Sequence, residues 1–357
     1  MTTLIETLSA CLRALENGEV VEAAAIGNDL WAQSPYHPEV LHVLAVIAER
    51  QGNLAQAMIW RRQAIAHSTV AQGNILLALE RNREARELYD EALKIDTYNM
   101  AACNALAAMF QVPAPFDPKV QAFGRPPLNL YKTPIGSYFV PSDAPNDIVI
   151  RRMRAGKVFE EEIIEAVRPY VRPGSVVLDV GANFGQMSLL FSDLVGPSGH
   201  VYAFEADDFI CYVLKLNIAI NRKTNISVID RAVYDTCDEI LKYPRQDFAR
   251  FESYGSYGID PNASEGRAVK TITIDSLGIE APISVIKVDI QGSDIFALRG
   301  AVETIRRHQP AIIFEYEEQF QAAFKTSARD YDEFVRNIGY RAHKVVNGIN
   351  YLILPGA

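Results

Sequence analysis

The sequence predicts an all-α helical domain followed by a doubly wound, mainly parallel α/β domain that ends in an antiparallel hairpin. Three observations lead to this fold class. An offset of 34 residues recurs within residues 1–112, prolines crowd residues 113–127, and buried apolar strands alternate with helices over residues 128–357. A chain of 357 residues is also longer than one ordinary domain.

The composition is that of a folded protein without a broad basic surface. Hydrophobic residues make up 49% of the chain and charged residues 22%, and the formal net charge is −9. Such a charge argues against nucleic acid or an acidic membrane as partner, although a local basic groove stays open. The four cysteines form no metal or disulfide pattern, the N-terminus lacks a basic leader, and no apolar run approaches the ~20 residues of a membrane span. We therefore expect a cytoplasmic protein.

Glycines and small residues repeat along the N-terminal third. Gly18 and Ala23 recur as Gly52 and Ala57, and a third unit, ALERNREARELYDEALKID, arrives early and lacks the glycine. Its first helix is expected to be short or irregular, and residues 98–110 to form a closing helix. The pattern resembles the tetratricopeptide repeat family, which stacks helical hairpins of this period. That resemblance implies a surface for a protein partner or for dimerisation; packing against the next domain is the open alternative.

The five prolines from Pro113 to Pro127 are typical of a linker. Beyond them, helical spacing is read in GKVFEEEIIEAVRPYV, DIFALRGAVETIRRH and DYDEFVRNIG, among others. The expected strands are VVLDV, HVYAFEA, NISVIDRAVYD, VKTITID, ISVIKVDI and PAIIFEYE, with YRAHKVV and YLILP forming the last hairpin. Parallel sheets bind ligands at the carboxyl ends of their strands, so the residues there are the candidates for a site.

A glycine-rich loop, DVGANFG, follows the first of these buried strands. Gly181 and Gly185 permit backbone angles and close approach that a Cβ would block, and the helix from Phe184 directs its N–H groups at the gap. Glu205 ends the next strand, where a carboxylate can accept both hydroxyls of a ribose. The spacing suits neither a dinucleotide nor a nucleoside triphosphate. An acid at Asp179 suits a cofactor with an amino group, such as S-adenosylmethionine; a structural strand–helix turn is the alternative.

The ordered motifs LDVGANFG, VYAFEADD, IKVDIQGSDIFALRGA and PAIIFEYE, with GKVFEEE upstream, resemble the FkbM-type methyltransferases. The resemblance covers about residues 128–357. It implies a Rossmann-like, class I fold that depends on S-adenosylmethionine, with O-methylation of sugar or other hydroxyl groups as the typical activity. Gln291 stands where the family often has Glu, so no catalytic role is carried over to it.

The resemblance also implies roles for individual residues. The glycine loop would bracket the methionine part of the cofactor, Glu205 would take the ribose hydroxyls, and Asp230 and Ala232 would lie by the adenine. Phe159 and Glu160 would cover the cofactor from the preceding helix, although Asp230 also fits a solvated turn and Glu160 a surface charge. The expected cofactor-binding residues are Phe159, Glu160, Asp179, Gly181, Asn183, Gly185, Glu205, Asp230 and Ala232.

Two carboxylates at neighbouring strand ends are the candidate catalytic groups. Methyl transfer to an alcohol needs a group that accepts the hydroxyl proton. Asp289 and Glu315 could act as base and orienting partner, or could together hold a divalent cation. Lys287 faces the same side of its strand as Asp289 and is a third catalytic candidate, with a plain ion pair as the alternative. His308 and His343 are taken as structural.

The long irregular stretch from residue 235 to 267 carries aromatic and hydroxyl side chains. Tyr254, Ser256 and Tyr257 are the predicted acceptor-binding residues, suited to stacking on a sugar; a surface loop is the alternative. The leading hypothesis is an O-methyltransferase acting on a sugar, glycan or glycosylated intermediate. An N-methyltransferase acting on a protein or small molecule, and a non-catalytic repeat scaffold, are the competing functions.

Overall fold

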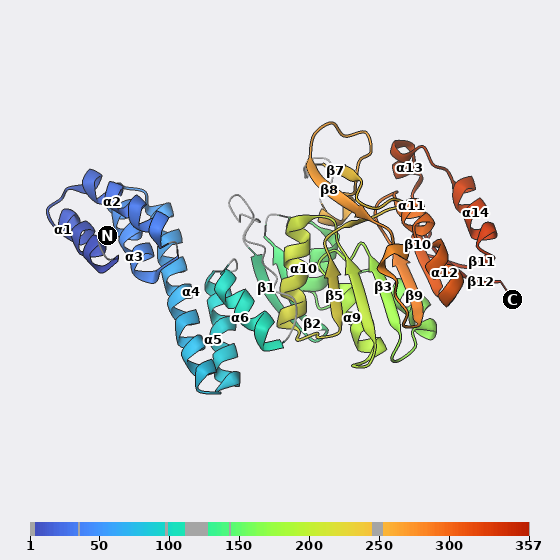
Figure 1. The fold of residues 1–357 in the computed structure, drawn as a ribbon, viewed down its shortest axis with the longest axis horizontal. Coiled ribbons are helices and arrows are strands. Elements are labelled where there is room, and N and C mark those ends of the chain that lie inside the picture. Colours follow the sequence, from blue (N-terminus) through green and yellow to red (C-terminus); the bar gives the residue numbers. More distant parts are fainter. Residues whose placement is uncertain are drawn as a thin grey trace. The chain divides into compact units, whose positions relative to one another are not determined.

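The computed structural model describes residues 4–34, 36–96, 99–110, 128–142, 144–244 and 253–356 (Figure 1). The chain divides into two compact units, Met1–Met109 and Phe110–Ala357. The predicted linker at residues 113–127 lies outside the described residues. None of the helices described is long and apolar enough to cross a membrane. All four cysteines are free thiols.

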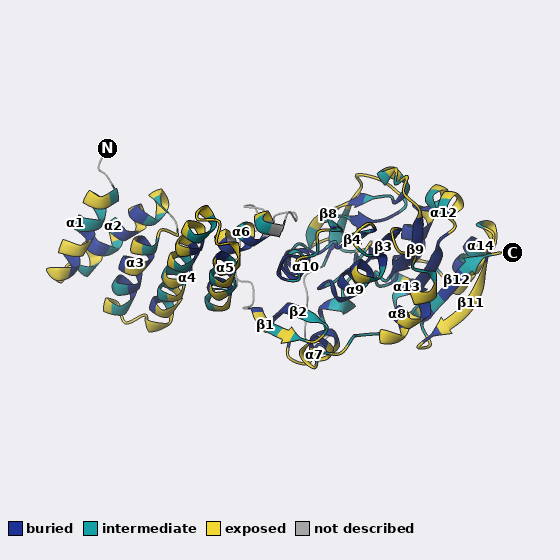
Figure 2. Ribbon diagram, turned by 90° about the horizontal axis from the view of Figure 1, so that it is seen from below, coloured by how far each residue is buried: buried dark blue, intermediate teal, exposed yellow. Residues whose placement is uncertain are grey.

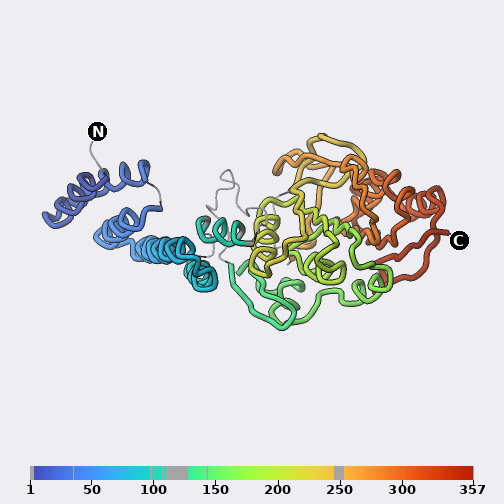
Figure 3. Tube along the Cα trace, turned by 60° about the horizontal axis from the view of Figure 1, so that its bottom comes forward, coloured from blue at the N-terminus to red at the C-terminus, as the bar shows by residue number. Residues whose placement is uncertain are grey.

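The first unit contains helices in succession, and the trace in Figure 3 shows the chain turning back between them. Consecutive helices pack against each other from the first to the fifth. The small residues predicted to allow close approach, Ala23, Ala57 and Ala85, are buried. The helices are α1 (Leu4–Glu16), α2 (Val20–Gln33), α3 (Pro38–Arg50), α4 (Leu54–Ala78), α5 (Asn82–Ile95) and α6 (Met100–Phe110).

Three turns of this unit share one geometry. At Gly18, Gly52 and Glu80 the backbone φ is positive, at +80°, +76° and +57°. In each turn this residue donates its N–H three residues back, and the next residue donates five residues back. The third turn thus forms without a glycine. The expected short or irregular helix before it is not found, because α4 continues unbroken for 25 residues.

The second unit is built on a mixed sheet with the strand order β11-β12-β10-β9-β3-β4-β5. The strands β10, β9, β3, β4 and β5 run parallel, and β11–β12 is the predicted antiparallel hairpin. Figure 2 shows the central strands as buried. The strands are β3 (Val176–Val180), β4 (His200–Phe204), β5 (Ile226–Ile229), β9 (Ile283–Val288), β10 (Ala311–Glu315), β11 (Tyr340–Val346) and β12 (Asn350–Pro355).

Alternation along β3 divides the interior between the two faces of the sheet. Val176, Leu178 and Val180 belong to the apolar cluster that includes α11 (Asp294–Arg299), α12 (Val302–His308) and α14 (Ala328–Asn337). Asp179 therefore faces the other side, where α9 (Gln186–Val195) contacts β3 and its Ser188 donates to the Asp179 carboxylate.

Several elements differ from the sequence prediction. The run NISVIDRAVYD divides into β5 and β6 (Ala232–Val233), and VKTITID becomes β8 (Arg267–Ile272). β8 lies between β6 and the unpredicted β7 (Ile240–Tyr243) and pairs with both in a separate small sheet. The predicted helix over residues 294–308 breaks at Gly300, where a Cβ would lie 2.1 Å from the Tyr234 carbonyl oxygen.

Three further predictions need correction or addition around the sheet. The predicted helix from Gly156 shortens to α8 (Glu161–Val167) and a 3-10 turn. Two elements precede it unpredicted: the hairpin β1 (Leu128–Thr133) and β2 (Gly136–Pro141), and α7 (Ile148–Arg154). The remaining helices are α10 (Asp208–Ile220), which contacts β2 and β5, and α13 (Glu318–Phe324), which was not predicted.

Candidate active site

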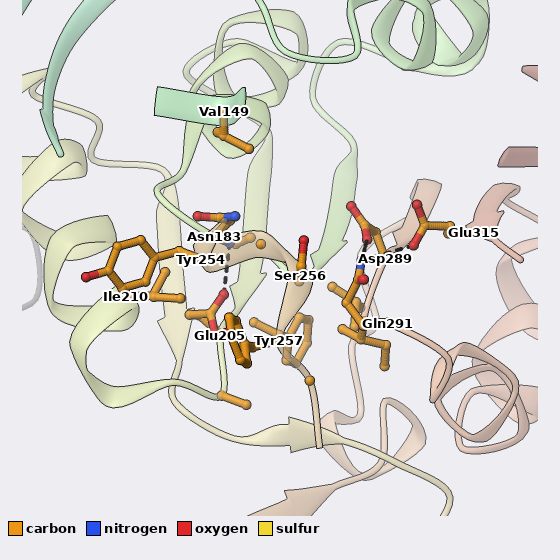
Figure 4. Close-up of a pocket in the computed structure, with 18 of the residues that line it drawn as sticks. Val149, Asn183, Glu205, Ile210, Tyr254, Ser256, Tyr257, Asp289, Gln291 and Glu315 are labelled. Carbon is orange, nitrogen blue, oxygen red and sulfur yellow. Dashed lines mark hydrogen bonds between the residues drawn. The ribbon is translucent and has the colours of Figure 1, made fainter. Parts of the chain in front are cut away.

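A cavity of about 270 Å³ lies at the carboxyl ends of the central strands (Figure 4). The chain runs from β3 outward to β4 and β5 and then returns to β9 on the other side of β3. The cavity therefore opens where the strand order reverses, the usual ligand position in such sheets. The predicted residues that line it are Phe159, Glu160, Gly181, Asn183, Glu205, Ala232, Tyr254, Ser256, Tyr257, Lys287, Asp289 and Glu315.

Three predicted cofactor residues do not line this cavity. Asp179 is fully buried behind it, and Gly185 begins α9. Asp230 is exposed, because β5 ends at Ile229 and only the following residues turn toward the cavity. Its exposure also fits the solvated-turn alternative, and a position beside the adenine stays a prediction.

The two glycines of the loop are required by packing of the protein on itself. Gly181 has φ +81°, and a Cβ there would lie 1.9 Å from the carbonyl oxygen of Asp289. At Gly185, with φ +89°, a Cβ would lie 2.4 Å from Leu214 Cδ1. In this structure the close contacts at both glycines are made by protein atoms, from Asp289 after β9 and from Leu214 of α10, and the close approach of a cofactor stays a prediction.

Glu205 holds the loop through backbone N–H groups. Its carboxylate accepts hydrogen bonds from the N–H of Asn183 and of Asp207, each at 2.9 Å. Asn183 itself has φ +49°, and its side chain accepts the N–H of Phe184. Burial nevertheless raises the pKa of Glu205 to about 7. Each carboxylate oxygen retains a lone pair for a ligand hydroxyl.

Lys287 is committed to the protein. Its ammonium donates to the Gly181 carbonyl at 2.9 Å and lies 3.3 Å from Asp179 and 3.4 Å from Asp289. These neighbouring carboxylates raise the pKa of Lys287 against the effect of burial. The ion pair considered for this residue is therefore present, and it involves both carboxylates.

The two catalytic candidates are joined by an amide. Gln291 Nε2 donates to Asp289 at 3.2 Å and to Glu315 at 3.0 Å (Figure 4). Gln291 has φ +54° and lies in a loop whose N–H groups at Ile290 and Gly292 bond the buried carboxylate of Asp294. Burial, followed by the charge of Asp289, raises the pKa of Glu315 to about 10. The Glu315 carboxyl group therefore holds its proton more strongly than an exposed glutamate does.

Glu160 occupies a strained backbone position at the start of α8. Its φ is +50°, which is uncommon for a side chain without special cause. The carboxyl group lines the cavity and accepts a hydrogen bond from Asn347 in the β11–β12 turn at 3.3 Å. Burial and the nearby Asp289 raise the pKa of Glu160 to about 7. The cavity-facing position of this half-buried side chain favours a binding role over a plain surface charge.

The predicted acceptor loop covers one wall of the cavity. Tyr254 is buried and packs against Phe184 and Phe209, and its N–H bonds Asp147, which also caps α7. Its ring thus anchors the segment, whereas Ser256 and Tyr257 follow along the cavity wall. Residues 245–252 of the predicted loop lie outside the described residues.

Residues beyond the prediction complete the lining or support it. Gln291 was given no role from the sequence, because its role depends on the hydrogen bonds that its amide donates to Asp289 and Glu315. Arg231 also lines the cavity, and Gln186 binds the backbone of Lys157 and Phe159, which fixes the entry to α8. The only sequence signal was the position of Gln291 two residues after a strand-end Asp.

The residues fit S-adenosylmethionine better than a metal ion. Among the described residues, no group of three His, Cys, Asp or Glu is arranged to hold a metal. Buried carboxyl groups at both ends of the cavity can accept hydrogen bonds from hydroxyls or an ammonium, and apolar side chains such as Ile210 and Phe184 line the space between.

Comparison with known proteins identifies a methyltransferase domain in the part of the chain that contains this cavity. The family model of the Methyltransferase FkbM domain matches residues 179–342. The resemblance inferred from the motifs is thereby confirmed for this domain, whereas the tetratricopeptide character of the helices is not confirmed. The protein-L-isoaspartate O-methyltransferase of Methanothrix thermoacetophila is 37% identical over 59 residues, which are 16% of this chain and 28% of that protein. The chain covers 21 to 28% of the length of its curated relatives.

Two solved structures show a distant likeness. Methyltransferase FkbM from Methylobacillus flagellatus is 18% identical, with 53% of this chain and 50% of that chain covered at a TM-score of 0.33. Fibrillarin of Aeropyrum pernix, solved with natively bound S-adenosyl-L-methionine, is 12% identical, with 66% and 85% covered at a TM-score of 0.32. Likeness at this level carries no argument about function.

Proposed function

We propose that the second unit is an S-adenosylmethionine-dependent O-methyltransferase that acts on a hydroxyl of a sugar, glycan or glycosylated intermediate. The observation that carries the proposal is the single cavity in which the glycine loop, Glu205 and Asp289 meet at the strand-order reversal. The match to the Methyltransferase FkbM domain supports it. A cytoplasmic location is part of the same proposal.

The two ends of the cavity have different functions in this proposal, cofactor binding at one end and acceptor binding at the other. Glu205 accepts the ribose hydroxyls, with the loop around Asn183 held in place by the same carboxylate. At the other end stand Glu160, Asp289 and Glu315, and Lys287, the cation that the described residues place there, is paired with Asp179 and Asp289. When bound, the cofactor supplies an electrophilic methyl group.

The acceptor end favours a group that donates hydrogen bonds and carries no negative charge. Among the described residues at this end, carboxyl oxygens and the Gln291 carbonyl are acceptors, and the Lys287 ammonium is already paired with two carboxylates, so these residues disfavour a phosphate or carboxylate. Hydroxyls of a sugar satisfy this wall, and Tyr257 offers an aromatic surface to the apolar face of a sugar ring. An amine would also donate, so product analysis separates O- from N-methylation.

Titration calorimetry of the full chain with S-adenosylhomocysteine tests the cofactor. We expect micromolar binding in the wild type and at least a tenfold loss in Glu205→Ala, because the variant removes the acceptor of the ribose hydroxyls. Glu303→Ala, an exposed position on α12, is the matched control and should bind as the wild type does. Absence of binding to the folded wild-type protein contradicts the proposal and favours the scaffold function.

The first unit is proposed to bind a protein partner or a second copy of the chain. Its repeated turns and buried alanines support a stacked-hairpin architecture. Sedimentation of the full chain over a range of concentrations separates self-association from recruitment of another protein.

A further inference from the structure

Four carboxyl groups line the acceptor end, those of Glu160, Asp289, Glu315 and Glu317, and they differ in how firmly the protein holds them. Glu315 lies 7% exposed, and burial together with the charges of Asp289 and Asp294 raises the pKa of its carboxyl group. Its carboxyl group also accepts the Gln291 amide at 3.0 Å. Glu315 therefore suits a group that holds its proton better than one that takes up the proton of a reacting hydroxyl.

Asp289 is also poorly placed to take up a proton. One carboxylate oxygen accepts from Gln291, and the other faces the Lys287 ammonium at 3.4 Å. Protonation of Asp289 would remove the favourable interaction between its carboxylate and the buried Lys287 ammonium. It would also remove a negative charge that balances the charge of Lys287. Asp289 thus suits the orienting of a ligand hydroxyl better than the storage of its proton.

Of the other two carboxyl groups, that of Glu317 accepts a hydrogen bond from Gln319, whereas that of Glu160 interacts electrostatically with Asp289 and Lys287. Within the described residues, its side chain accepts one hydrogen bond, from the neutral Asn347 amide. Its pKa of about 7 suits a base that must both accept and release a proton near neutral pH. The charged or titratable groups around it are Asp289 and Lys287 of the β9 end, Glu315 and Glu317 of the β10 end, and Glu162 of its own helix.

The backbone at Glu160 gives an independent reason to assign it a role. A glutamate in the left-handed region costs on the order of 1 kcal/mol, which glycine would avoid. The sequence keeps a carboxylate there, and Gln186 fixes the preceding turn by accepting the N–H of Phe159 at 2.7 Å. The strain places the Glu160 side chain on the cavity wall instead of in solvent.

We propose that Glu160 is the proton acceptor for methyl transfer, which deepens the proposed function and rests on it. The acceptor oxygen forms a bond to the methyl carbon, and the carbon–sulfur bond breaks with its electron pair left on sulfur. The hydroxyl proton moves to a carboxylate oxygen of Glu160. One positive charge, one carboxylate and one hydroxyl are thus replaced by three neutral groups, so the net charge of the cavity is unchanged.

This role requires that Glu160 be ionised when the positively charged cofactor is bound. A cation in the cavity favours the ionised carboxylate, and the reciprocal effect is that the ionised carboxylate favours the cation. S-adenosylmethionine and S-adenosylhomocysteine differ by the methyl group and its positive charge. The ratio of their affinities therefore reports the charge of Glu160 without any acceptor or turnover.

The experiment is calorimetry of the full chain with each of the two ligands at pH 6 and pH 8. In the wild type we expect the affinity for S-adenosylmethionine relative to S-adenosylhomocysteine to rise about tenfold, the equivalent of a shift of one pKa unit. Glu160→Gln should abolish this rise, and Glu160→Asp should retain it. Glu318→Gln, an exposed neighbour on α13, is the control and should behave as the wild type does.

The outcomes separate the inference from the function on which it rests. An equal pH-dependent rise in wild type and Glu160→Gln overturns the assignment, as does a rise lost only in Glu315→Gln or no rise in the wild type. Failure of both ligands to bind the folded wild type contradicts the proposed methyltransferase function instead.

Discussion

Two glutamates at opposite ends of the cavity have almost the same burial but different protonation. Glu205 is 8% exposed and Glu315 7% exposed. Burial is the largest cause of the raised pKa in both, yet the value is about 7 for Glu205 and about 10 for Glu315. Burial alone therefore does not decide which of them is ionised.

The difference lies in their partners. Glu205 accepts two backbone N–H groups, which stabilise the ionised form. Glu315 accepts one amide and lies near Asp289, Asp294 and Glu317, whose charges oppose its ionisation. The comparison teaches that backbone N–H groups determine the ionisation of the carboxyl group at one end of the cavity. At the other end, the charges of neighbouring side chains determine it.

The largest expected effect comes from a substitution in the glycine loop, at the end of the cavity that contains Glu205. Gly181→Ala brings a Cβ to 1.9 Å from the Asp289 carbonyl oxygen at a φ of +81°, so β3 and β9 must separate. We expect a loss of about 4 kcal/mol, in the range of severe core disruption. Gly278→Ala also has a positive φ, +57° with ψ 35°, but has open space around its Cβ, and should lose only about 1 kcal/mol.

Hydrogen exchange of β3 and α9 in the full chain measures this effect. Both tryptophans, Trp31 and Trp60, belong to the first unit, so their fluorescence during urea unfolding is an internal control that should not change. Equal losses in the two glycine variants would contradict the steric explanation.

The second effect concerns Lys287, whose ammonium lies between the carboxylates of Asp179 and Asp289. Lys287→Met leaves the fully buried Asp179 and its neighbour Asp289 without their ammonium partner. We expect a loss of about 3 kcal/mol, measured by the same exchange experiment, because an unpaired buried carboxylate is costly. Lys270→Met removes an exposed lysine 3.9 Å from Asp238 and should cost less than about 1 kcal/mol. Similar losses would show that Lys287 is not needed for charge balance.

Much of this arrangement could be predicted from the sequence because strand ends are easy to locate. The apolar runs before Glu205, Asp289 and Glu315 mark buried parallel strands, and their carboxyl ends must share one edge of the sheet. The glycine loop followed from local backbone requirements. These inferences need only the order of elements along the chain.

The partners of the same residues could not be predicted. That Gly181 is needed to clear the Asp289 carbonyl, or that Gln291 bridges two carboxyl groups, depends on contacts across strands. The left-handed backbone of Glu160 is set by packing at the start of α8, and no residue preference favours it. The exposure of Asp230 follows from the departure of β6 into another sheet.

The last expected effect, which is small for any single pH unit, tests the same comparison through pH. A carboxyl group whose pKa is raised in the folded state binds protons more readily there than in the unfolded chain, so stability falls as pH rises between the two values. For Glu205 this window runs from 4.5 to about 7, and for Glu315 from 4.5 to about 10. The fall should amount to about 1 kcal/mol per pH unit for each group within its window.

Hydrogen exchange of β3 and β10 in the ligand-free full chain, analysed as free energies of opening, distinguishes the two glutamates. Glu315→Gln should reduce the fall in stability above pH 7.5, where Glu205 is already ionised in both states. Glu205→Gln should leave that upper part unchanged and reduce the fall below pH 7. Because Cys237 has a lowered pKa and contributes with the opposite sign near its titration, the comparison uses differences between each variant and the wild type. If both variants flatten the same part of the curve, the two ends titrate as one group, and partners do not separate them.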